Sequence, residues 1–404
     1  MSSITEKTEK ARIWLAAGLL FLLTSPMWVW GINQLFMAFF SIMIFLVSFP
    51  KIKLAKSSKW MSFAFFLQII FLWVAIVTEK TNLNGFIVLF MTILAYSTIF
   101  LCEKEYWKLV IDKFVIILAI LLIPSLIEYV LISFLGVNIP YHYITECPVN
   151  PERDYYIYNF NAYLVDNILL DRVRFFGFFD EPGVVGNVMM VLLFVQKFNF
   201  RKWHNIVLLL AGVFSFSLTF FFALMAYYLI VGGIKTKLSF IILAVVLVAL
   251  FYDNPIVEDL IFSRMAIEDG QLAGYNREGA DFDSWFSHRT VSEYFFWGYS
   301  GNVEYAASWK WALVRWGIVP CFLYVFSIFL SAVQSRLHLR DLALVLIILV
   351  IIFIQRPFFM NFLYAFIFVV PHLYLSANQN QSTLLVNSKP NQLGRGIAIP
   401  ERQI

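Results

Sequence analysis

Residues 109–135 read LVIDKFVIILAILLIPSLIEYVLISFL, a stretch of long apolar side chains interrupted by few charged ones. A membrane-spanning helix needs about 20 predominantly apolar residues, so this stretch is long enough to cross a bilayer. The whole chain of 404 residues has the same character, because 61% of it is hydrophobic and only 14% is charged. Soluble domains carry about 25% charged residues. The sequence therefore predicts an all-α, polytopic integral membrane protein.

The hydropathy of the chain predicts about 12 transmembrane helices, each long enough to cross a bilayer directly or with some tilt. We place them at residues 13–30, 33–50, 60–78, 85–102, 109–135, 183–198, 205–218, 219–234, 238–252, 307–334, 342–356 and 358–376. The first span has a basic lead but no convincing cleavage site, so we interpret it as a retained helix and not as a signal peptide.

Two of these boundaries divide longer apolar stretches. As one helix, residues 205–234 would be about 45 Å long, which exceeds a bilayer core of about 30 Å, so we divide them near SLTFF. Residues 342–376 contain Gln355-Arg356-Pro357, and proline ends or kinks a helix. Residues 1–376 then form a single transmembrane domain, and the polar residues 377–404 form a cytoplasmic tail that we expect to be disordered.

Basic residues divide unevenly between the two sets of loops that these spans define. The set that includes both termini carries most of them, and the positive-inside rule places that set in the cytoplasm. Two large loops, at about 136–182 and 253–306, then face the exterior or periplasm. Almost all basic residues on this outer side are arginines: Arg153, Arg172, Arg174, Arg264, Arg277 and Arg289.

The outward arginines predict a binding site for an anion. Arginine presents a planar fork that binds carboxylate or phosphate bidentately and keeps its charge when partly desolvated. Local salt bridges to nearby acids are the alternative interpretation for any one of these arginines. Outside the membrane, a phosphate-bearing substrate is most naturally linked to a lipid, as in a polyprenyl-diphosphate sugar. Arginines can stabilise its diphosphate leaving group without a metal or cofactor, and the short basic blocks give no indication of nucleic-acid binding.

Three other features are candidates for function. His288 lies beside Arg289 in SWFSHRTVSEYF and has the right ordinary pKa to accept a proton near neutral pH, although a surface histidine is the more common explanation. Glu128 is an ionisable residue at membrane depth and therefore a functional candidate, although it is close enough to the outer end for snorkelling. Asp281-Phe282-Asp283 has the spacing of a metal–nucleotide pair but lies on the side without nucleotides.

Residues 174–188, RFFGFFDEPGVVGNV, place charge directly before an apolar run. Arg174, Gly177, Phe179, Glu181 and Pro182 match the signature Arg-x-x-Gly-x-Phe-x-(Asp/Glu)-Pro, so the stretch resembles that of bacterial O-antigen polymerases and the related O-antigen ligases. We expect Pro182 to lie in the first helical turn, with the positive end of that helix directed at the bound anion.

A looser resemblance to the same family lies in the second large loop. There Asn276-Arg277 is followed by FFWGYSGN at 295–302 and then by a helix with the mid-helix glycine Gly317. The ligases typically carry a histidine late in this loop, whereas His288 precedes the glycine turn. That departure favours a polymerase over a ligase.

The resemblance implies a metal-independent glycosyltransferase of GT-C-like architecture in the bacterial inner membrane. It would join oligosaccharide repeat units carried on undecaprenyl diphosphate, and the enzyme itself would be surrounded by membrane lipid. A chain-length regulator protein is an additional candidate partner. We expect catalytic roles for Arg174, Arg277 and Glu181, and substrate-binding roles for Arg172, Arg264, Arg289, His288 and Asp180. Arg264 and Arg289 remain alternatives to Arg277. The ligase and a lipid-linked sugar transporter remain alternative functions.

Asp180 and Glu181 have two interpretations. They either orient Arg174 or take the proton of an acceptor hydroxyl as a general base. We prefer the orienting role, because it needs only an ionised carboxylate.

Overall fold

The computed structural model of the chain describes residues 2–30, 34–52, 59–78, 83–145, 153–165, 174–235, 237–239, 241–242, 267–268, 271–272, 293–298, 309–355 and 362–387. Most of these residues are helical. The first helices, with two short 3-10 turns among them, are α1 (Ser2–Leu23), η1 (Met27–Val29), α2 (Gln34–Ser48), η2 (Phe49–Lys51), α3 (Lys59–Thr78), α4 (Leu83–Leu101) and α5 (Lys104–Ser133). The later ones are α7 (Pro182–Val195), α8 (Trp203–Phe214), α9 (Leu218–Val231), α14 (Glu293–Trp297), α15 (Trp309–Trp316), α16 (Ile318–Gln334), α17 (Leu339–Gln355) and α18 (Phe362–Asn387).

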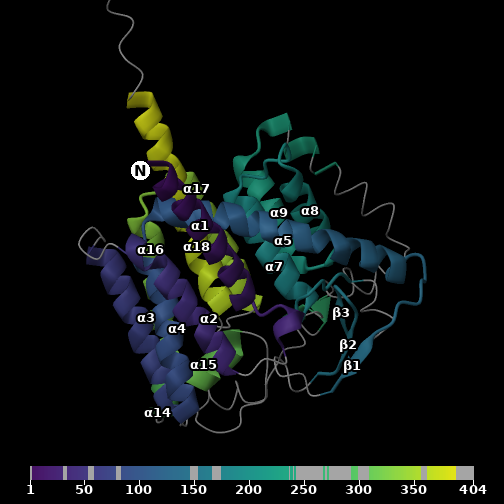
Figure 1. The fold of residues 1–404 in the computed structure, drawn as a ribbon, viewed down its shortest axis with the longest axis horizontal. Coiled ribbons are helices and arrows are strands. Elements are labelled where there is room, and N and C mark those ends of the chain that lie inside the picture. The colour runs from purple at the N-terminus through teal and green to yellow at the C-terminus, as the bar shows by residue number, and fades with distance from the viewer. Residues whose placement is uncertain are drawn as a thin grey trace, which may run out of the picture.

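The helices form two groups that α5 connects (Figure 1). One group contains α1 to α4 with α16, and the other contains α7, α8 and α9. The long helix α5 packs on α1 in the first group and on α8 in the second, and α18 packs on both α5 and α7. Among the described residues, α5 alone is both long and apolar enough to cross a membrane, and several other helices are apolar but shorter.

Two predicted helix boundaries are confirmed. The stretch 205–234 contains two helices, because α8 ends at Phe214 and α9 begins at Leu218. Helix α17 is described as far as Gln355, and the Arg356-Pro357 pair lies outside the described residues, so the break there stays a prediction. Helix α7 begins at Pro182, whose fixed φ suits the first helical turn and whose missing N–H would have had no helical partner there.

Two helices differ from the prediction. Gly317 does not lie within a helix but separates α15 from α16, with φ at 76°. A side chain there would collide with the backbone of Phe296 and Gly298, so the close approach of α14 requires glycine at this position. Helix α18 continues to Asn387 and so enters the predicted tail, of which residues 388–404 lie outside the described residues.

The first large loop contains strands that the hydropathy did not predict. Strands β1 (His142–Ile144), β2 (Tyr155–Ile157) and β3 (Ala162–Leu164) form an antiparallel sheet in the order β1-β2-β3. Strands β4 (Ile267–Glu268) and β5 (Gln271–Leu272) pair in the second loop. The class is therefore mostly α, with a small sheet beside the C-terminal end of α5 (Figure 1).

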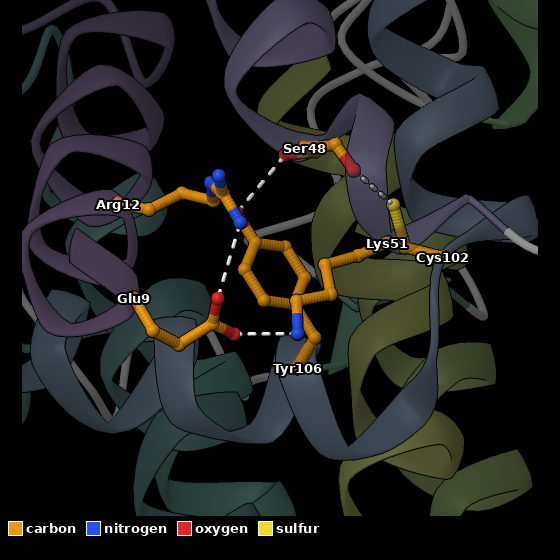
Figure 2. A network of polar contacts seen from close by, with 6 residues as sticks. All are labelled: Glu9, Arg12, Ser48, Lys51, Cys102 and Tyr106. Atoms are coloured by element: carbon orange, nitrogen blue, oxygen red, sulfur yellow. Dashed lines mark hydrogen bonds and ion pairs between the residues drawn. The ribbon is translucent and has the colours of Figure 1, made fainter. Parts of the chain in front are cut away.

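A polar network joins the start of the chain to the ends of two other helices (Figure 2). The Glu9 carboxylate forms ion pairs with Lys51 Nζ at 2.6 Å and with Arg12 Nη1 at 3.1 Å. Nearby, the Ser48 hydroxyl lies 3.2 Å from the Tyr106 hydroxyl. The network fixes α1 against the C-terminal end of α2 and the first turn of α5.

Candidate functional site

The signature segment, residues 174–181, has an apolar middle and charged ends. Its four phenylalanines are buried: Phe175, Phe176, Phe178 and Phe179. Arg174 at one end, and Asp180 and Glu181 at the other, are half-buried. Buried aromatic side chains thus hold the segment in the fold while its charged groups stay partly accessible.

The turn at the centre of the segment requires glycine. Gly177 has φ at 57°, a left-handed conformation that glycine adopts without steric cost. The Phe179 N–H donates to the Phe176 carbonyl at 3.2 Å and closes the turn. A side chain at Gly177 would lie 3.2 Å from Phe175 Cζ, which is a tight contact. The chain reverses here, so Arg174 and Asp180 lie on the two arms that leave the same turn.

Backbone hydrogen bonds fix the segment to two helical elements. The Phe175 N–H donates to the Phe214 carbonyl at the end of α8, at 2.8 Å. The Met27 N–H in η1 donates to the Phe178 carbonyl, also at 2.8 Å. The two partners are far apart in sequence, so the segment's position depends on the tertiary fold.

The sheet of the outer loop supplies two further contacts. The Ala162 N–H in β3 donates to the Gly177 carbonyl at 2.9 Å. The Tyr155 hydroxyl in β2 donates to the Asp180 carbonyl at 3.2 Å. The sheet is therefore part of the scaffold that positions the charged ends of the segment.

Glu128 anchors that sheet to α5. Only 5% of Glu128 is exposed, and its carboxylate accepts hydrogen bonds from Asn159 N at 3.2 Å and Phe160 N at 2.9 Å. It also accepts one from Asn161 Nδ2 at 2.8 Å. Ser125, one turn earlier, donates to the Phe160 carbonyl at 2.9 Å. Glu128 thus does not snorkel but holds the turn between β2 and β3.

Helix α7 begins where the signature segment ends. Glu181 is its N-cap residue, and the Val184 N–H donates to the Glu181 carbonyl at 3.1 Å. Every residue of α7 is buried, from Pro182 to Val195. The partial positive charge of a helix N-terminus therefore lies directly beside the half-buried charged groups of the segment. Asn187, in the second turn, is fully buried, and neither of its amide atoms has a hydrogen-bond partner among the described residues.

The C-terminal end of α7 carries a polar cluster that sequence reasoning missed. Gln196, its C-cap residue, donates to Asp112 Oδ1 at 2.8 Å and accepts from Lys202 Nζ at 2.7 Å. The Tyr374 hydroxyl donates to the same Asp112 oxygen at 2.6 Å. These residues come from distant parts of the chain, so no local motif could have indicated the cluster.

The predicted site residues fall into two sets. Arg174, Asp180 and Glu181 are brought to one turn and the helix start that follows it. The others lie outside the described residues: Arg172, Arg264, Arg277, His288 and Arg289. The acidic pair Asp281 and Asp283 also lies outside them.

Within the described ranges, no three His, Cys, Asp or Glu side chains gather as a metal site requires. The chain matches no protein-family model, no curated protein and no solved structure.

Proposed function

We propose that the chain is a polysaccharide polymerase of the O-antigen type. It would join repeat units carried on undecaprenyl diphosphate by metal-independent glycosyl transfer on the outer face of a bacterial inner membrane. One observation carries the proposal: half-buried Arg174 and the half-buried Asp180 and Glu181 flank one buried glycine turn, and Glu181 is the N-cap residue of the fully buried helix α7. That combination suits an anion that must be held partly out of water.

The surface of α16 supports a membrane location. Its exposed side is apolar and carries Phe322, Val325, Phe329 and Val333. Its buried side includes Ser327 and Ser331, and Ser327 accepts a hydrogen bond from Gln68 on α3. A helix that faces water shows the reverse pattern, with apolar side chains inward. Hydrocarbon outside the protein explains this arrangement.

Helix α5 has the same inverted pattern. Ile120, Ile123 and Ile127 are exposed, whereas Ser125 and Glu128 are buried. Ionisable side chains within a membrane segment face the protein interior, where they find partners. These two helices support a location in a membrane; the architecture of about 12 spans with both termini in the cytoplasm is part of the proposal.

The proposed chemistry assigns one task to each group of the segment. Arg174 binds the diphosphate of the donor and stabilises the charge that develops on it as the sugar leaves. The N-terminus of α7 adds its partial positive charge. Asp180 and Glu181 orient the arginine. The alternative is that one of these two carboxylates takes the proton of the acceptor hydroxyl as a general base.

Residues of the second loop complete the proposed site. Arg277 contributes the second catalytic arginine, with Arg264 and Arg289 as alternatives for that role. Arg172, from the first loop, and His288, from the second, contact the sugar or phosphate groups of the substrate. A chain-length regulator is an additional candidate partner.

Replacing Arg174 tests the proposal in cells. With Arg174→Ala, the surface glycan should shift from long chains to single repeat units, and Arg174→Lys should restore part of the length, because lysine keeps the charge but loses the fork. Arg201→Ala is the matched control, since this exposed arginine lies beyond the opposite end of α7. Chain length is measured on a polyacrylamide gel at equal expression. An unchanged glycan profile in Arg174→Ala would exclude the proposed role.

A transporter of lipid-linked sugars is a second candidate, favoured by the buried polar side chains of the helices. Besides the unpartnered Asn187 amide, His372 on α18 is fully buried and contacts the Ser331 hydroxyl at 2.6 Å through Nε2. Substrate paths in transporters are lined by such groups. Reconstituted protein that moves the carrier across a bilayer without forming glycosidic bonds would favour this function. Finished polymer accumulating on the carrier after gene deletion would instead indicate a ligase.

A further inference from the structure

One face of the outer-loop sheet carries a row of tyrosines. Strand pairing places Tyr143 opposite Tyr156, and Tyr156 opposite Tyr163, so all three side chains lie on the same face. Tyr141 and Tyr158 share that face, two residues from Tyr143 and Tyr156 along their strands. We call these five residues the tyrosine row.

The rings of the tyrosine row are in contact from one end to the other. The centroids of Tyr141 and Tyr156 are 4.7 Å apart, and those of Tyr143 and Tyr156 are 5.6 Å apart. Tyr158 lies 5.5 Å from Tyr141 and 5.6 Å from Tyr163. Such edge and tilted packing is favourable for aromatic pairs at these distances.

The row changes from exposed to buried as it approaches the signature segment. Tyr143 is 51% exposed and Tyr141 is 48% exposed, whereas Tyr163 is 1% exposed. The Tyr163 ring then contacts Phe176 at 5.7 Å. Burial raises the pKa of the Tyr163 hydroxyl above its ordinary value, which keeps it neutral. A series of ring contacts thus joins the exposed rings to the segment that carries Arg174.

The chemistry of the exposed end matches an oligosaccharide. A pyranose ring has apolar C–H faces that pack on an aromatic ring, and hydroxyls that need hydrogen-bond partners around its edge. Tyrosine supplies both an apolar body and a polar tip. At this end the Tyr143 hydroxyl donates to Asp154 Oδ2 at 2.7 Å, so a carboxylate acceptor lies beside the exposed rings.

We propose that Tyr141, Tyr143 and Tyr156, with Asp154, bind the glycan portion of the substrate while its diphosphate lies at Arg174. This subsite rests on the proposed polymerase function, because continuity with the signature segment identifies which glycan it binds. A bilayer contact is less well matched, since Asp154 would place a carboxylate against the lipid. A protein strand would find only short edges among the described residues, because the edge strands β1 and β3 have three residues each.

Glycan binding by the intact protein in lipid nanodiscs tests the subsite. The probe is the lipid-free repeat-unit oligosaccharide released from the surface polysaccharide of the cell that carries this gene. Tyr141→Ala should weaken binding about tenfold, as truncation of an aromatic anchor does, while Tyr141→Phe should bind nearly as wild type because it keeps the ring. Trp203→Ala is the matched control, because Trp203 is 48% exposed at the start of α8, beyond the other end of α7.

Hydrogen–deuterium exchange provides a second measurement that does not depend on a variant. Adding the oligosaccharide should slow amide exchange in residues 141–144 and 153–158 of the wild-type protein. If the bilayer alone protects these residues and added glycan makes no difference, they contact the membrane and the proposal is overturned. Equal glycan binding by Tyr141→Ala and wild type, with no protection of this sheet, would also overturn it.

The two proposals fail separately. If Arg174→Ala abolishes polymerisation while Tyr141→Ala binds glycan normally, the polymerase stands and the subsite is wrong. If Tyr141→Ala loses glycan binding while Arg174→Ala leaves chain length unchanged, the surface binds glycan but the polymerase proposal is wrong. Both variants should show the predicted losses if both proposals hold.

Discussion

The two ends of helix α7 use polar side chains in opposite ways. At the C-terminal end, Gln196 is buried and shares hydrogen bonds with Asp112, Tyr374 and Lys202. At the N-terminal end, Arg174, Asp180 and Glu181 are half-buried beside the helix start. The first cluster joins α5, α7 and α18 to one another, and the second remains accessible to molecules outside the fold.

This difference distinguishes a structural polar cluster from our proposed binding site. Buried polar groups are stable when their hydrogen bonds are made within the protein, and the Gln196 amide satisfies that condition. In the proposed site, a partly exposed arginine and a helix N-terminus are the groups that suit an anion. We therefore expect substitutions at the N-terminal end to affect activity, and those at the C-terminal end to affect stability alone.

Glu128→Ala should have the largest effect on stability. It also affects the N-terminal end of α7, because Glu128 holds the sheet that contacts the signature segment. It would leave the N–H groups of Asn159 and Phe160 and the buried Asn161 amide without this acceptor, at a total cost of about 3 kcal/mol. SDS unfolding in detergent measures the stability, and the gel assay measures glycan chain length, which should shorten. Glu128→Gln, which keeps one oxygen, should lie between Ala and wild type. Wild-type stability in Glu128→Ala would show that the sheet is not held from α5.

Asp112→Ala should have the next largest effect, at the C-terminal end. It removes the acceptor shared by Gln196 Nε2 and the Tyr374 hydroxyl, and should lower the unfolding free energy by about 2 kcal/mol. The same SDS unfolding experiment checks this value. Chain length should stay unchanged in protein that remains folded. A specific loss of polymerisation without loss of stability would break the comparison, because it would give the C-terminal cluster a functional role.

Gly177→Ala should cost about 1–2 kcal/mol, because an L-residue is strained in the left-handed region. The added carbon also meets the Phe175 ring. The turn then shifts the arms that carry Arg174 and Asp180, so activity should fall more than stability does. A ratio of polymer yield to folded protein measures that difference. Equal losses of yield and folded protein would mean that the turn has no effect on the site beyond folding.

Lys51→Ala should have the smallest effect, no more than about 1 kcal/mol, as expected for a partly exposed ion pair. Its 2.6 Å contact with Glu9 lies in the network of Figure 2, apart from both ends of α7. Added salt should weaken the wild-type protein slightly and leave the variant unaffected. Any change of chain length in this variant would mean that small losses of stability anywhere alter activity.

The sequence predicted features with local causes and missed those that depend on distant residues. The division of residues 205–234 follows from a length that exceeds the bilayer core, and the start of α7 follows from Pro182 itself. The strands of the first loop are three residues long, too short to show alternation. The role of Glu128 depends on hydrogen bonds to a turn more than thirty residues later in the chain.

The candidate site shows the same division. Its charged residues were predicted from their side of the membrane and from the signature. The sheet that positions them, with the tyrosine row on its face, required the tertiary structure. The second-loop residues, with Arg277 foremost among them, lie outside the described residues, so their roles stay predictions.

Purified protein in liposomes, supplied with an undecaprenyl-diphosphate-linked repeat unit and excess EDTA, tests the central claim most directly. The account predicts that the wild type forms a ladder of glycan lengths without added metal, and that Arg174→Ala forms it at a rate lower by about 100-fold or more, as the loss of a transition-state donor requires. Arg201→Ala should form the ladder at the wild-type rate. A ladder of equal rate in Arg174→Ala, or none from the wild type, would contradict the account.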